Sequence, residues 1–400
     1  MFRTAFWLTL IPVVVASLLG AAPTARAQDA WTPPGWVMNP ETAAEYNKRE
    51  KRLAREAQRS PRPSKSDIDV LKKLVYYYAS QLTFPERDNL PKDVRDRFLT
   101  ELLSGLTSSA AREEMIKIVM GIVPDLLTHP DLVVRENAVL MLVDCSIEPA
   151  QLIPATPPKP YDPSHQLLIQ IASDSNQDWV VRNAAVLGLQ RIARDGKLGN
   201  PERSNVAAAL IKGMTDAAGE KWWFRFRLVE ALGEVDRITL VDGTPVIIES
   251  LMDRLTDEKE HFLVRSEAAR SISRLPLAGT NVALIMEHVG HLLEQMGRVQ
   301  AKSPQAPVWR QCFGRVYLSF RPSNESQARR GWGFLYKPGN AKTTAEGLWA
   351  VAFPVLKPFV EQAQPPAVPA GQADAIKTWV ETTKEATPDR RVVPNGTKTY

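Results

Sequence analysis

Histidine and cysteine are the residues of this chain best suited to metal or nucleophilic chemistry, and only one pair of them is closely spaced. His288 and His291 lie three residues apart, so on a helix they would share a face and could hold a metal ion together. No third ligand lies at a recognisable spacing, and the segment lacks the H-E-x-x-H order of zinc peptidases. We therefore expect a half-buried polar patch here, with this pair as the weak metal candidate, and we expect no cofactor.

The two cysteines indicate neither a disulfide framework nor a nucleophile. Cys145 and Cys312 lie in distant parts of the chain, each among apolar residues at helical spacing, so we expect two buried thiols. The chain also contains no G-x-S-x-G, G-x-G-x-x-G, G-x-x-x-x-G-K-[ST] or C-x-x-C-H motif. These patterns favour no catalytic reaction, and we expect a protein that is not an enzyme.

A cluster of aromatic and basic residues is the strongest candidate for a binding site. Trp222, Trp223 and Phe224 are consecutive, and successive residues of a helix point about 100° apart, so at least one ring should reach the surface. Exposed rings beside guanidinium groups are typical of protein-binding hot spots and of sugar-stacking sites. The alternative is that the rings fill a wide gap between helices. The candidate binding residues are Trp179, Trp222, Trp223, Arg225, Phe226, Arg227 and Trp309.

A repeated spacing predicts the helices that carry these residues. In Val134-Arg135, an apolar residue precedes an arginine, and Ala138 and Leu142 follow the arginine at three and seven positions. These positions share one stripe of a helix, and the arginine lies near the helix start, where it could reach an acidic or carbonyl group of the adjacent repeat. The same spacing recurs at intervals of 40–47 residues. The anchor arginines of the six copies are Arg95, Arg135, Arg182, Arg225, Arg265 and Arg310.

Each copy is preceded by a second predicted helix, which makes each unit a helical hairpin. The predicted partner helices are 67–82, 113–127, 165–172, 205–214, 246–255 and 282–296. These features resemble the HEAT-repeat family, an armadillo-like α-solenoid class whose units run about 40–47 residues. The resemblance covers roughly residues 66–320 and implies a row of about six stacked hairpins that share one core. The chain departs from the family pattern in a proline-rich insertion at 154–163 and in the aromatic segment at 220–227.

We expect an all-α fold with a helical cap after the array and flexible termini. The first 27 residues have a basic start, an apolar run and an Ala25-Arg26-Ala27 end, which predicts a cleaved secretory signal and a soluble periplasmic or extracellular protein without an integral membrane span. The predicted divisions are 1–27 signal peptide, 28–65 proline-rich and basic arm or linker, 66–320 repeat array, 321–362 cap, and 363–400 linker, short helix and disordered tail.

Net charge and repeat architecture together favour a partner-binding role. The full chain carries +5, a weak excess that does not indicate nucleic-acid binding. Our leading hypothesis is a non-catalytic exported scaffold that binds an unidentified protein or peptide on the surface of the repeats. A second hypothesis is an enzyme or cofactor-handling protein that uses a groove of the array, as some HEAT-like lyases do. A third is recognition of an envelope polysaccharide through the tryptophans.

Overall fold

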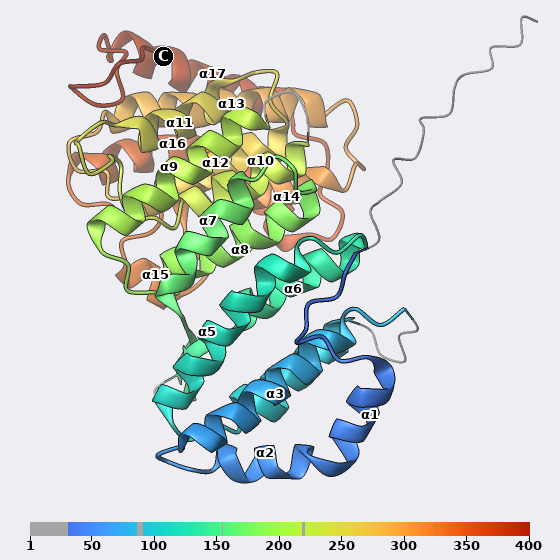
Figure 1. The fold of residues 1–400 in the computed structure, drawn as a ribbon. Coiled ribbons are helices and arrows are strands. Elements are labelled where there is room, and N and C mark those ends of the chain that lie inside the picture. Colours follow the sequence, from blue (N-terminus) through green and yellow to red (C-terminus); the bar gives the residue numbers. More distant parts are fainter. Residues whose placement is uncertain (1–30, 86–90, 154, 218–220) are drawn as a thin grey trace, which may run out of the picture.

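The fold is all-α in the computed structural model, which describes residues 31–85, 91–153, 155–217 and 221–400. These residues form seventeen α-helices, and their order in space follows the chain, from α1–α3 at one end to α16 and α17 at the other (Figure 1). In this part of the chain no helix is both long and apolar enough to cross a membrane. The predicted signal peptide, residues 1–27, lies outside the described residues.

The N-terminal segment differs from the predicted arm or linker, because it packs on the body of the protein. Helices α1 (Pro40–Arg49) and α2 (Lys51–Gln58) both contact α3 (Lys65–Gln81). Their small or amphipathic side chains Ala43, Tyr46 and Ala54 are at most 4% exposed. Most of the basic residues that suggested a solvated arm are exposed, whereas Lys51 pairs with Glu101 at 2.6 Å, so charge counting missed the narrow apolar stripe.

The next helices begin the succession of hairpins. Helix α4 (Pro91–Arg97) continues into a π-helical turn (Phe98–Leu103), and α5 (Ser109–Leu126) precedes α6 (Leu132–Asp144). Asp131 caps α6 through its side chain, which accepts a hydrogen bond from the backbone N–H of Val133 and satisfies one of the free donors at the helix start.

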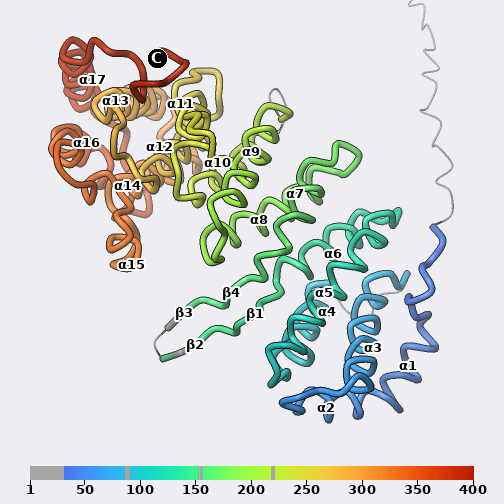
Figure 2. The backbone as a smooth tube through the Cα atoms, turned by 60° about the vertical axis from the view of Figure 1, so that its left-hand side comes forward, coloured from blue at the N-terminus to red at the C-terminus, as the bar shows by residue number. Residues whose placement is uncertain are grey.

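The proline-rich insertion forms a β-ribbon, which the all-α prediction missed. Strand β1 (Ser146–Glu148) pairs antiparallel with β4 (Lys159–Pro160), and β2 (Gln151–Leu152) pairs with β3 (Ala155–Thr156). The ribbon projects from the helices between α6 and α7 (Figure 2). Its strands are two or three residues long, too short for an alternating pattern to be read from the sequence.

Four further hairpins follow the ribbon, and each pairs two successive helices that contact one another. Their bounds are α7 (His165–Ser173) with α8 (Trp179–Asp195), α9 (Asn200–Asp216) with α10 (Trp222–Leu232), α11 (Val246–Thr256) with α12 (Phe262–Arg274), and α13 (Val282–Gln300) with α14 (Val308–Phe320). A 3₁₀ turn (Asp162–Ser164) leads into α7.

The helices form two layers. Helices α6, α8, α10, α12 and α14, which carry the arginine motif and are called the motif helices below, contact one another in succession, and α7, α9, α11 and α13 do the same. Small residues allow this close packing: Ala138, Ala185 and Ala268 are fully buried, as their spacing predicts. At Gly188 even a β-carbon would lie 2.8 Å from side-chain atoms of both Leu168 and Val143, so that position requires glycine.

Helices α16 (Asn340–Glu361) and α17 (Ala370–Glu385) cover the C-terminal end. Helix α16 contacts α14, α17 contacts α13, and the two contact each other, so the cover has two helices where the sequence predicted a cap ending near residue 362. A short helix α15 (Glu325–Arg329) and a 3₁₀ turn (Phe334–Tyr336) connect α14 to α16.

The last residues are ordered against α11 and α13, so the prediction of a disordered tail is wrong. Val392 and Val393 are at most 4% exposed, and the carbonyl of Val392 accepts a hydrogen bond from the backbone N–H of Asn281. Arg390 forms two hydrogen bonds of 2.6 and 2.9 Å with the Glu287 carboxylate. The Tyr400 hydroxyl donates to a carbonyl of α11. The tail is therefore held against the helices mainly by hydrogen bonds and ion pairs, with few buried apolar side chains.

Candidate binding site

A pocket of about 330 Å³ lies over four successive motif helices. It receives side chains from α8, α10, α12 and α14, so its shape depends on how these helices stack. It contains four of the seven predicted binding residues. The lining residues are Asn183, Trp222, Trp223, Phe226, Arg227, Leu263, Gln311 and Arg315.

The aromatic rings of this pocket differ in exposure, as the 100° rotation per residue requires. Trp222 is 39% exposed and stacks on the imidazole of His261, with ring centroids 4.3 Å apart. Phe224 is fully buried, and Trp223 lies half-buried beside it. Phe226 is 7% exposed at the pocket wall. The cluster therefore combines an exposed ring, Trp222, with a buried one, Phe224. The prediction of a ring at the surface holds for Trp222, and the alternative of a ring that packs between helices holds for Phe224.

Guanidinium groups complete the wall around Phe226. Arg315 of α14 lies 4.6 Å from the centre of the Phe226 ring, and Arg227 lies 5.6 Å from it, both within the range of a cation–π contact. Arg227 also forms an ion pair with Glu230 at 2.7 Å, and Arg315 forms one with the buried Glu267 at 2.9 Å. These ion pairs fix the cationic groups before any ligand arrives, which lowers the ordering cost of binding.

Charged residues continue from this pocket along the motif helices. The fully buried Glu267 also pairs with Arg270 at 3.4 Å, and Arg274 bonds to Glu234 at 2.9 Å. Burial raises the pKa of Glu234 above its ordinary value, and the Oε2 atom of Glu234 has no hydrogen-bond partner in the described part of the chain. A second pocket of about 390 Å³ lies here, lined by Ala193, Arg194, Arg203, Gly233, Glu234, Asp236, Arg274, Arg330 and Trp332.

We call the first pocket, over α8, α10, α12 and α14, the aromatic pocket. Three predicted binding residues lie outside it. Arg225 forms two hydrogen bonds of 2.7 and 2.8 Å with Glu260. The ring of Trp179 packs against Phe224 and under the guanidinium of Arg182. Trp309 is 5% exposed and donates its indole N–H to a backbone carbonyl. These three side chains contact neighbouring helices or loops, and none of them lines the pocket.

The anchor arginines link the helices of a hairpin, and some also link neighbouring hairpins. Arg182, Arg225 and Arg265 each donate to a backbone carbonyl at the C-terminal end of the preceding helix, at 2.8–3.0 Å. Arg225 and Arg265 also reach a polar side chain of the next unit, as the sequence predicts.

The other three anchor arginines differ in the partners of their side chains. Arg95 bonds to Asp144 and Asn137 of the next unit. Arg135 bonds to Gln177, whose amide donates to the carbonyl that ends α5. Arg310 is exposed and its side chain lies at the surface of α14. The sixth copy of the motif therefore keeps the spacing without the buried arginine.

The two histidines of the predicted pair lie on α13 and have different partners. Burial lowers the pKa of His288 to about 4, and its ring lies against the Tyr400 ring. His291 instead contacts Glu258 at 3.2 Å. Within the described ranges no group of three or more potential ligands could hold a metal ion. Cys145 and Cys312 are free and buried, as the sequence predicts, and burial raises the pKa of both thiols.

Sequence reasoning missed the residues that complete the pocket, although the repeat spacing contains the signal for them. Asn183 and Gln311 each directly follow an anchor arginine, as the predicted Phe226 does, and Arg315 lies five residues after one. Positions one and five after the anchor are four apart, so they share a helix face. Reading these positions across all copies would have predicted a common surface on the motif helices.

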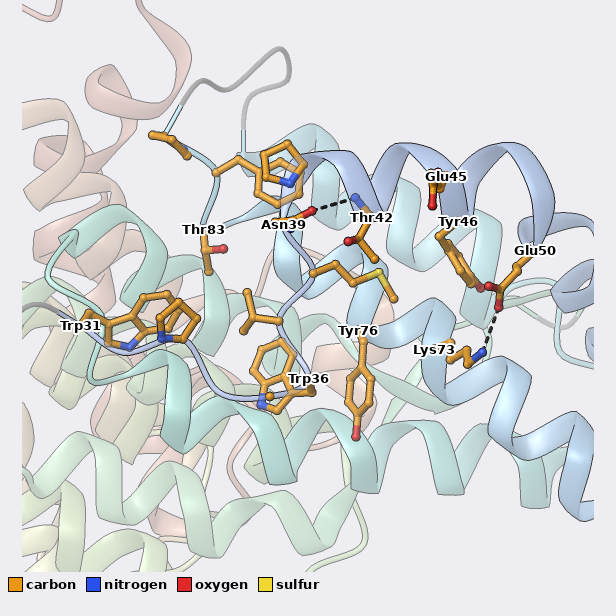
Figure 3. Close-up of a pocket in the computed structure, with 17 residues that line it drawn as sticks. Trp31, Trp36, Asn39, Thr42, Glu45, Tyr46, Glu50, Lys73, Tyr76 and Thr83 are labelled. Atoms are coloured by element: carbon orange, nitrogen blue, oxygen red, sulfur yellow. Dashed lines mark hydrogen bonds and ion pairs between the residues drawn. The ribbon is translucent and has the colours of Figure 1, made fainter.

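A further pocket lies far from this surface, at the N-terminal end. It has a volume of about 740 Å³ and lies between the segment before α1, helices α1 and α3, and the residues that follow α3 (Figure 3). Trp31, Trp36 and Tyr76 contribute rings to it. We call it the N-terminal pocket. Trp31 and Trp36 fall in the segment 28–65, for which the sequence predicts an arm or linker and no binding site.

Comparison with known proteins adds little to this description. No protein-family model and no curated protein matches the chain. Among solved structures, the chain is similar to the crystal structure of an engineered protein, with 13% sequence identity over 86% of this chain and 92% of the other, at a TM-score of 0.34. At this score the likeness does not bear on fold or function.

Proposed function

We propose that this protein is a non-catalytic, exported HEAT-like scaffold that binds a protein or peptide partner on its motif helices. The observation that carries the proposal is the aromatic pocket, because four successive helices contribute to it and its lining combines an exposed tryptophan with two guanidinium groups held in ion pairs. Aromatic and arginine side chains in such surroundings supply most of the free energy of many protein interfaces.

The stacking of the helices supports the HEAT-like part of the proposal. From α7 to α14, each hairpin contacts its neighbours through both layers, which is the contact pattern of a solenoid. The anchor arginines Arg182, Arg225 and Arg265 make the same bond to the partner helix in three successive hairpins. A recurring bond at a recurring position favours repeated units over an irregular helical domain.

The polar groups of the pocket favour a peptide over a purely apolar ligand. The Oδ1 atom of Asn183 is buried and has no hydrogen-bond partner among the described residues, so it can accept from a backbone N–H. Trp222 offers one ring face, because His261 covers the other. A peptide that places an apolar side chain on Trp222 and an amide near Asn183 would satisfy both features.

The proposal is tested by peptide selection on the immobilised protein. A random peptide library is enriched on the wild-type protein, and the affinity of the enriched peptides is then measured by fluorescence anisotropy for Trp222→Ala/Trp223→Ala. We expect at least a tenfold loss of affinity, because removing a hot-spot ring typically costs about 2 kcal/mol or more. Tyr336→Ala is the matched control, since Tyr336 is 48% exposed and lies outside the pocket.

Two results would count against the proposal. Equal affinities for the wild-type protein and the double variant would remove the aromatic pocket as the site. Retention of envelope polysaccharide by the wild-type protein and not by the double variant, without peptide enrichment, would replace the peptide by a glycan. An unchanged melting temperature of the double variant ensures that either result reports on binding.

A further inference from the structure

The N-terminal pocket has the wall of an aromatic groove. Trp36 and Tyr76 lie with their rings stacked, centroids 5.5 Å apart, and Trp31 lies further along the same side (Figure 3). Prolines and Phe84 complete the wall, so most of the surface is apolar while its rim remains open to solvent. The apolar lining residues beyond the three rings are Pro33, Val37, Met38, Pro40, Phe84 and Pro85.

Hydrogen bonds hold the tryptophan rings of this groove in place. The indole N–H of Trp36 donates to Asp125 at 2.8 Å, and that of Trp31 donates to Thr128 at 3.1 Å. Asp125 lies in the last turn of α5 and Thr128 lies two residues after its end, whereas the other wall of the pocket comes from α1 and α3. Because the rings are fixed from behind, a ligand stacking on their faces would immobilise little further side-chain freedom.

We propose that the N-terminal pocket binds a proline-rich segment of a partner protein in the polyproline II conformation, with a basic residue beside the prolines. Grooves lined by fixed aromatic rings bind this conformation because proline rings pack between them and the ligand is already extended before binding. This site is separate from the aromatic pocket on the motif helices and does not depend on the proposed function.

A buried hydroxyl supplies the polar contact that such a ligand needs. Tyr46 lines the pocket, is 4% exposed, and its hydroxyl has no hydrogen-bond partner within the described residues. The hydroxyl points towards the end of the pocket where Glu50 and Lys73 form an ion pair of 3.0 Å (Figure 3). A polyproline II segment has no internal hydrogen bonds, so its carbonyl oxygens are free to accept from a donor of this kind.

The charge on the rim favours a basic residue in the ligand. Glu45 lies on the pocket wall, is exposed, and forms no ion pair with any described residue. Lys73, the basic residue of the lining, is already paired with Glu50. The pocket therefore presents one unpaired negative charge to a ligand, and an arginine or lysine that follows the prolines would complement it.

The test uses two labelled synthetic peptides, a ten-residue polyproline and the same peptide with two arginines at one end, with binding followed by fluorescence anisotropy. We expect both to bind and the arginine peptide to bind more tightly. Glu45→Lys should weaken the arginine peptide about two- to fivefold and leave the neutral peptide unchanged. Glu41→Lys is the matched control, because Glu41 is exposed on the same helix and does not line the pocket.

Tyr46→Phe tests the hydroxyl without disturbing the fold, since that hydroxyl bonds to no described residue. It should weaken both peptides about two- to tenfold, the usual range for one hydrogen bond. Absence of binding by either peptide, or equal binding by wild type and both variants, would overturn the proposal. So would stronger binding of tetramethylammonium than of the peptides, which would identify a cation cage. Retained peptide binding in Trp222→Ala/Trp223→Ala would separate this site from the motif-helix pocket.

Discussion

Burial determines the chemistry of His288, which the sequence suggested as a possible metal ligand. Its Nε2 atom has no hydrogen-bond partner in the described part of the chain, and desolvation lowers its pKa from 6.5 to about 4. The folded protein therefore holds this histidine neutral at pH values where the unfolded chain binds a proton. The free energy of unfolding must then depend on pH through this residue.

The expected dependence has a definite sign. The unfolded chain takes up the proton first as pH falls, so stability is fully present above about pH 6.5 and is lost between about pH 6.5 and pH 4. The loss attributable to His288 is about 3 kcal/mol at about 1.4 kcal/mol per pKa unit. Urea unfolding of the wild type and His288→Leu at about pH 7 and pH 4.5 measures it. An identical pH-dependent loss in the two proteins would contradict this account.

The sequence predicted the composition of the aromatic site better than its geometry. The rotation of about 100° per residue was enough to predict that the rings from Trp222 to Phe224 differ in exposure. It could not predict which of them faces solvent, because that depends on where α12 and α14 lie. Arg315 is 89 residues from Phe226 (315 − 226), and only the stacking of the helices brings them together.

At the scale of the helix, the anchor arginine has a testable role. Arg265 is 1% exposed and donates to the carbonyl of Leu255 at 3.0 Å and to Gln295 at 2.7 Å. Arg310 holds the same motif position and is exposed. If the arginine links the two helices of a hairpin, replacing Arg265 should lower the free energy of unfolding strongly, and replacing Arg310 should leave it nearly unchanged.

Substitution by methionine, which keeps the aliphatic stem, separates these roles. Arg265→Met removes the donor to the carbonyl of the buried Leu255 and to the half-buried Gln295 side chain, and should lower the free energy of unfolding by about 2–4 kcal/mol, whereas Arg310→Met should change it by less than about 0.5 kcal/mol. Chemical denaturation of both variants provides the measurement. Similar losses in the two would mean that the motif position, and not burial of the arginine, determines its contribution.

The sequence predicted helices well and short irregular elements poorly. Apolar periodicity placed α3, α7, α11 and α13 within a few residues of their observed bounds, because each buries a stripe on the same core. The β-ribbon has strands of two or three residues whose partners are set by backbone pairing, and no side-chain pattern records that. A long element repeats its apolar pattern often enough to be predicted from the sequence, and a strand of two or three residues does not.

At the scale of the whole molecule, the C-terminal tail joins elements that are distant in sequence. Glu249 of α11 is 1% exposed and accepts from Thr397, and Glu287 of α13 is 4% exposed and accepts from Arg390. Composition could not predict this, since the tail is polar and rich in turn residues. Its order comes from carboxylates on other helices that need donors once they are buried.

Deleting residues 389–400 should destabilise the protein by several kcal/mol. The deletion leaves Glu249 and Glu287 with fewer donors in surroundings where a buried unpaired charge costs about 3–5 kcal/mol. Adding Glu249→Gln and Glu287→Gln to the truncated chain should restore part of the loss. Thermal unfolding and hydrogen exchange in α11 and α13 measure both effects. A truncated chain as stable as the full chain would show that the tail only rests on the surface.

The β-ribbon is a place where the backbone could be cut while the folded halves stay together. Ile153 near its tip is 94% exposed, while β1 and β4 at its base pair with each other and α6 packs on α8. A cut in the chain near this exposed tip would disturb no helix contact. The two fragments would remain associated through the ribbon base and the helix contact, which makes this loop a natural point at which to divide the protein into complementing halves.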